Sequence, residues 1–98
     1  MTRQDEAGAT DRMRRALLAF ESAQMLLVAA RRRVQGQPTE KIEAFWLASG
    51  GRTERHVHAT ATELIAAFQA FSAAGLVADA DDQRLVAQAQ RYPVAVVA

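Results

Sequence analysis

Alanine is the feature that most limits what this chain can fold into, since 22 of its 98 residues are alanine. Alanine is the strongest helix former among the amino acids. Each buried alanine removes little apolar area from water, at a gain of about 25 cal/mol per Å². Only 22 residues are Leu, Ile, Val or Phe, the side chains that fill a core. We therefore expect a folded helical domain with a thin core, which an oligomer or a partner protein completes.

The clearest helix is predicted between residues 11 and 35. Apolar residues recur there at alternating spacings of four and three, which places them on one face of a helix. Gly36 followed by Pro38 ends this helix. Residues 1–10 lack the periodicity and are predicted to be a frayed terminus. The predicted stripe consists of Met13, Leu17, Phe20, Gln24, Leu27, Arg31 and Val34.

Two further helices are predicted in the middle of the chain. Thr39 is suited to cap a short helix, which we expect the sequence Ser49-Gly50-Gly51 to stop. A longer helix restarts at Thr53 and runs to Gly75. Gly75 is placed where a left-handed residue ends a helix, and Leu76 is the apolar residue that accompanies such an ending.

A last helix is predicted after Asp79 and must end before Pro93, because the residue before a proline disfavours helical geometry. Residues 93–98 are apolar and are expected to form an extended tail. The prediction for residues 1–98 is one all-α domain. Its architecture is a small, irregular antiparallel bundle of about four helices, one of them short, which we expect to form a homodimer.

Composition and charge exclude several classes of protein. The chain has no cysteine, so disulfides and thiolate chemistry are excluded. Its longest strictly apolar run, residues 25–30, is far shorter than the roughly 20 residues that a membrane span needs. The opening residues carry charges in place of the apolar segment of a signal peptide. We therefore expect a cytoplasmic protein without membrane contact.

Arginines cluster at both ends of the first predicted helix, and they suggest nucleic-acid binding as the alternative function. The candidate residues are Arg12 and Arg15 at one end, with Arg32 and Arg33 at the other. Successive residues of a helix point about 100° apart, so these arginines do not form one basic face. The net charge is only +1, and the chain lacks a recognised nucleic-acid motif. We favour the interpretation that these arginines form solvated surface and bind no nucleic acid.

Four other residues are candidates for contact with a protein. Gln24 and Arg31 interrupt the predicted apolar stripe, where polar side chains can fix the register of a helix pair. The alternative is that this part of the stripe is exposed to solvent, with the Arg31 guanidinium reaching water. Phe45 and Trp46 are suited to be an exposed docking site, because aromatic residues dominate binding hot spots. The alternative, burial as the largest side chains of a thin core, is the one we favour.

Chemistry at a metal or a catalytic centre is not indicated. The two histidines, His56 and His58, point to different sides of a helix and have no evident third ligand. No serine lies in a nucleophile motif. We therefore expect no metal, no cofactor and no enzymatic activity. The predicted function is non-catalytic protein interaction, as a small regulator, adaptor or inhibitor that acts through a helical surface.

Overall fold

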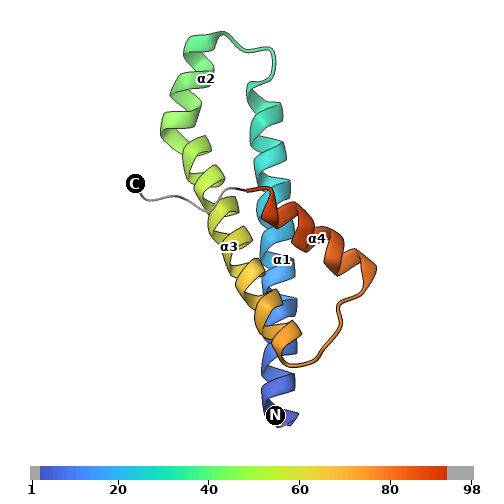
Figure 1. The fold of residues 1–98 in the computed structure, drawn as a ribbon. Helices are drawn as coiled ribbons and strands as arrows, with labels where there is room; N and C mark the ends of the chain where they lie inside the picture. The colour runs from blue at the N-terminus through green and yellow to red at the C-terminus, as the bar shows by residue number, and fades with distance from the viewer. Residues whose placement is uncertain (1–2, 93–98) are drawn as a thin grey trace.

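The computed structural model describes residues 3–92, which form α1 (Arg3–Val34), α2 (Thr39–Phe45), the π-helical turn η1 (Trp46–Gly50), α3 (Gly51–Ala73) and α4 (Ala80–Gln90). Figure 1 shows α1 beside a second rod in which α2, η1 and α3 follow one another, with α4 lying across the pair. The rods run antiparallel. Within this described range no strand occurs, so the prediction of an all-α fold is confirmed. The predicted extended tail at 93–98 lies outside the described residues.

The first helix begins earlier than predicted, at Arg3, so the frayed terminus is wrong for residues 3–10. Asp5 and Glu6 lie in its first turn, where the helix dipole favours negative charge. The Thr10 hydroxyl donates to the Glu6 carbonyl at 2.8 Å, a bond inside a continuing helix and not a cap. Residues 3–8 are exposed on every side, so apolar periodicity had no means of detecting them.

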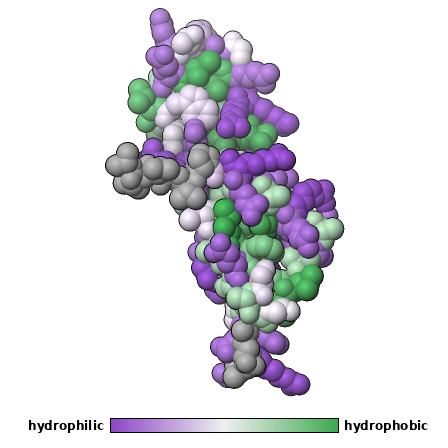
Figure 2. All heavy atoms as spheres, viewed as in Figure 1, coloured by the Kyte–Doolittle hydropathy of each residue, from purple (hydrophilic) through white to green (hydrophobic). Residues whose placement is uncertain are grey.

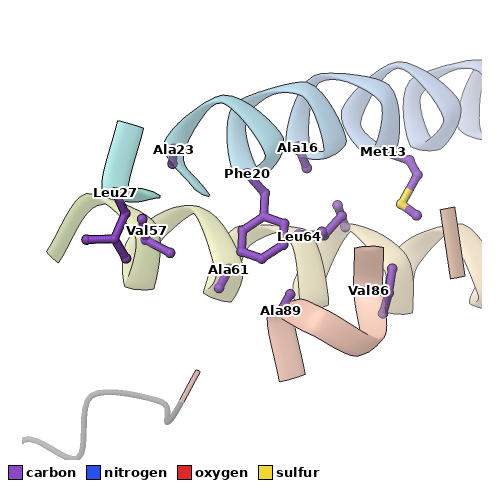
Figure 3. Packing of buried hydrophobic residues seen from close by; sticks show 11 residues of the cluster. Met13, Ala16, Phe20, Ala23, Leu27, Val57, Ala61, Leu64, Val86 and Ala89 are labelled. Atoms are coloured by element: carbon purple, nitrogen blue, oxygen red, sulfur yellow. The ribbon is translucent and has the colours of Figure 1, made fainter. Parts of the chain in front are cut away.

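The antiparallel rods pack through a buried stripe on α1, which consists of Met13, Ala16, Phe20, Ala23, Leu27 and Ala30. Figure 3 shows the part of this stripe from Met13 to Leu27. Met13, Phe20 and Leu27 belong to both the predicted and the observed stripe. Between them the observed stripe contains alanines, where the prediction had Leu17, Gln24 and Arg31. Arg31 is exposed, so its predicted place in the stripe is wrong, and Gln24 is half-buried beside the stripe. Small side chains on α1 let the facing residues of α3 approach closely. Those facing residues are Val57, Ala61, Leu64 and Ala67.

The second rod continues through Gly50 and Gly51, so the predicted stop at Ser49-Gly50-Gly51 is wrong. The N–H of Gly51 donates to the carbonyl of Trp46, five residues earlier, which is the bond of a π-helix. Both glycines have ordinary helical backbone angles, with φ of −63° and −62°. Gly50 matters for its size, because a Cβ at this position would lie 2.0 Å from Cε3 of Trp46. The glycine makes room for the indole ring.

The end of α3 has the left-handed glycine that the sequence predicts. Gly75 has a φ of +80°. The N–H of Leu76 donates to the Phe71 carbonyl at 3.2 Å, and the N–H of Gly75 donates to the Ser72 carbonyl at 2.9 Å. These two bonds together define the Schellman ending of a helix. The predicted ending is confirmed.

The last helix, α4, closes the core over the two rods. Asp79 caps it, because its Oδ1 accepts the N–H of Asp82 at 2.8 Å. Val86 and Ala89 then join the core cluster (Figure 3). Partial burial, aided by the carboxylates of Asp79 and Asp81, raises the pKa of Asp82. The helix thus begins at the acidic cluster from which the sequence predicted it.

Candidate interaction surface

Large apolar side chains occupy the face of α1 that points away from α3. Leu18 is 61% exposed, Met25 is 68% exposed and Val28 is 46% exposed. Their spacing of seven and three places them on one side of the helix. Figure 2 shows apolar side chains interrupting the hydrophilic surface on the side in view. None of the helices within residues 3–92 combines the length and apolar character that crossing a bilayer requires.

A groove of about 780 Å³ lies beside the C-terminal half of α1. Met25 and Val28 contribute apolar surface from α1, and Tyr92, just beyond α4, lines it as well. Three consecutive arginines, 31–33, also border the groove. The exposed apolar face of α1 therefore continues into a hollow that combines apolar walls with positive charge.

Tyr92 follows α4 and contacts both α1 and α3, so it links these three helices at the groove. Its ring meets the ring of Phe20 on α1 edge-on, with centroids 5.8 Å apart, and that of His58 on α3 at 5.4 Å. Gln24 Nε2 donates to the Tyr92 hydroxyl at 3.5 Å. Sequence reasoning missed this residue, because it follows a helix and takes part in no periodic pattern. Its one signal was that it is the only tyrosine in the chain.

The residues predicted to contact a protein divide into two places. Gln24 and Arg31 line the same groove, although they do not interrupt the buried stripe. Phe45 and Trp46 lie on the other rod and contact each other, with ring centroids 5.5 Å apart. Both are half-buried, and Trp46 packs against the core. The structure therefore joins the first pair to the candidate surface and leaves the aromatic pair apart from the groove.

The arginines of the nucleic-acid alternative are also separated. Arg12 Nε donates to Glu63 Oε1 on α3 at 2.7 Å, and this hydrogen bond lowers the pKa of Glu63. Arg15 Nε donates to the Asp11 carbonyl at 3.4 Å. Arg32 and Arg33 lie about 26 Å beyond Arg15 along α1, at 1.5 Å per residue. Nucleic-acid binding stays a prediction, and one of its four arginines is already paired with a carboxylate.

Neither metal-ligand chemistry nor similarity points to another site. In the part of the chain that the structure describes, no group of three His, Asp or Glu side chains is placed to hold a metal ion. Comparisons with protein families, with curated proteins and with solved structures find no match. The exposed apolar face of α1, with the groove beside it, is therefore the candidate functional site.

Proposed function

We propose that this chain is a non-catalytic protein-interaction module that binds through the outward face of α1. The observation that carries the proposal is the exposure of Leu18, Met25 and Val28 on a helix whose other face already packs against α3. Covering apolar surface of this kind contributes about 25 cal/mol per Å². Several large apolar side chains on one exposed face are typical of a binding surface.

The composition of the core supports the same proposal. The largest fully buried side chains are Phe20, Leu27, Leu64 and Val57. Alanines occupy much of the remaining buried surface, and each contributes little apolar area. A small domain of this kind gains stability when a partner covers further apolar surface, because binding to the folded form alone shifts the folding equilibrium.

The chemistry of the surface defines the class of partner. An amphipathic helix suits an exposed helix face and an adjoining groove, because its apolar side chains recur at the spacing that such a surface offers. Arg31, Arg32 and Arg33 border one end of the groove. The partner is therefore expected to carry carboxylates near the end of its apolar row, where they meet these guanidinium groups.

Site-specific cross-linking tests this proposal. A photo-crosslinking amino acid replaces Met25, and the matched control carries it in place of Gln69, an exposed residue of α3. Both variants are irradiated in cells that express the chain, and the adducts are identified by mass spectrometry. Protein adducts at position 25 that are absent at position 69 support the interaction module. Equal or no labelling at the two positions refutes it.

A further inference from the structure

A second periodic row, which we call the outer strip, lies on the exposed side of α1, opposite the buried stripe. Its positions are spaced alternately by three and four residues, the same pattern that seats the buried stripe on α3. All seven of its side chains are exposed, and none has an ion pair among the contacts that the structure gives. The outer strip consists of Asp11, Arg14, Leu18, Glu21, Met25, Val28 and Arg32.

We propose that the outer strip binds the outer strip of a second copy of this chain, with the two α1 helices antiparallel. This inference rests on the proposed function and names its partner. A twofold axis between Glu21 and Ser22 places Leu18 opposite Met25 of the second copy. The same axis places Asp11 opposite Arg32 of the second copy, at both ends of the pair. The contacts between Leu18 and Met25 then flank Glu21 at the axis, and opposite charges meet at each end.

Charge decides the direction of the pairing. In a parallel pair, each residue of the outer strip faces its own copy, so all four of its charged residues oppose like charges. These residues are Asp11, Arg14, Glu21 and Arg32. Like charges placed directly opposite are unfavourable. The antiparallel pair removes three of these four oppositions, because Arg14 then lies near Val28 and Ala29 of the second copy, and it leaves only Glu21 beside Glu21 at the axis. Complementary ends therefore select an antiparallel second copy.

The surroundings of the outer strip leave room for a second helix. On one flank, α4 covers Gln24 and Leu17, which are half-buried. Arg14, Leu18 and Glu21 lie at the edge of that contact, where they line hollows together with residues of α4. The strip from residue 11 to residue 32 is about 30 Å long at 1.5 Å per residue. That length corresponds to about six helical turns, and all seven side chains along it are exposed.

Charge reversal tests the pairing. Sedimentation of the full chain over a range of concentrations gives the dissociation constant of the dimer. Asp11→Arg or Arg32→Asp alone turns both end contacts repulsive, and each is expected to raise this constant about tenfold, given that exposed ion pairs contribute ~0.2–1 kcal/mol each. The double variant restores the contacts with exchanged signs and returns to within about threefold of the wild type. Arg52→Asp, on exposed surface of α3, is the matched control and leaves the constant unchanged.

Cysteine cross-linking tests the direction, and the absence of native cysteine makes the result clear. A chain with both Leu18→Cys and Met25→Cys is expected to form a covalent dimer on oxidation. Met25→Cys alone is not, because the two copies of residue 25 lie about 10 Å apart along the axis. A disulfide needs Cα atoms roughly 4.4–6.8 Å apart. Efficient cross-linking of the single variant overturns the antiparallel arrangement.

The two proposals fail in different ways. A wild-type chain that stays monomeric at its highest soluble concentration overturns the dimer, as does a double charge variant no tighter than the single ones. If position 25 still cross-links to a different protein, the interaction module stands and only its partner is wrong. If position 25 cross-links to nothing and the chain is monomeric, both proposals are overturned.

Discussion

Gly50→Ala is expected to destabilise this protein, although alanine is the better helix former. The new Cβ would lie 2.0 Å from Cε3 and 2.6 Å from Cδ2 of Trp46. Carbon atoms in contact lie about 3.5–4.0 Å apart, so either the indole ring or the backbone must move by more than 1 Å or so. The ring is half-buried against the core and contacts Phe45, so its displacement removes existing contacts.

The magnitude follows from two opposed effects. Replacing glycine by alanine inside a helix is worth up to about 1 kcal/mol of added stability. Forcing additional atoms into a packed site costs about 1–3 kcal/mol. Because Trp46 is only partly buried and can yield toward solvent, we expect a net loss of about 1–2 kcal/mol. For a domain of this size, 1 kcal/mol corresponds to about 4–8 °C, so the unfolding midpoint falls by about 5–15 °C.

Thermal and urea unfolding, followed by circular dichroism, measure this loss. Gly8→Ala is the matched control, because Gly8 lies inside α1 and a Cβ there meets nothing within 4 Å. That variant is expected to gain up to about 1 kcal/mol. In a Trp46→Ala background, Gly50→Ala is expected to become stabilising, since the clash is gone. A Gly50→Ala variant as stable as the wild type, or a loss that persists without Trp46, refutes the reasoning.

Three further substitutions have defined outcomes. Phe20→Ala removes the ring at the centre of the core and is expected to cost about 3–5 kcal/mol, which leaves a largely unfolded chain by circular dichroism. Asp79→Ala removes the cap of α4 and is expected to cost about 1 kcal/mol, read from the urea midpoint. Glu63→Gln gives a small loss near neutral pH. Because Arg12 lowers the pKa of Glu63 below 4.5, that carboxylate stabilises the fold above pH 4.5 and loses its effect as pH falls through the lowered pKa. The difference in melting temperature between Glu63→Gln and the wild type therefore shrinks to zero in acid. A difference that stays constant at every pH contradicts this role of the Glu63 carboxylate.

The end of α3 and the start of α4 were predictable because their signals are local. Gly75 adopts the left-handed angle that glycine alone accepts easily, and Asp79 offers a carboxylate to the first turn of α4. Each signal operates within a few residues, whatever the rest of the chain does. Gly50 shows the limit of such signals. It resembles a helix stop in sequence, but the indole four residues earlier decides its role, and the pattern of glycines contains no information about that ring.

The stripe on α1 was predictable only in part because two periodic rows share Met13, Phe20 and Leu27. The larger side chain of Leu17 favours one row, whereas the structure buries the alanines of the other. Which row is buried depends on how closely α3 approaches, and that distance is a property of the pair of helices. The apolar pattern of a single helix does not predict this distance.

The sequence did not contain the physical reason that brings two of the predicted contact residues together. Gln24 and Arg31 were identified as interruptions of a buried stripe, and they instead line the groove that Tyr92 completes. The contact between Gln24 and Tyr92 joins residues 68 positions apart, which no local pattern reports. Exposure of Met25 and Val28 likewise follows from the choice of the buried row.

The π-helical turn η1 makes the orientation of α2 depend on the number of residues between Trp46 and Gly50. One residue turns an α-helix by about 100°, so deleting Ala48 permits uninterrupted i to i+4 bonding and rotates α2 relative to α3 by that angle. Ile42 and Phe45, now half-buried, then swing away from their present neighbours. The buried stripes through which α1 and α3 pack lie outside this turn. A relative of this chain that is one residue shorter in η1 is thus expected to keep the pairing of α1 with α3 and to present a different face of α2.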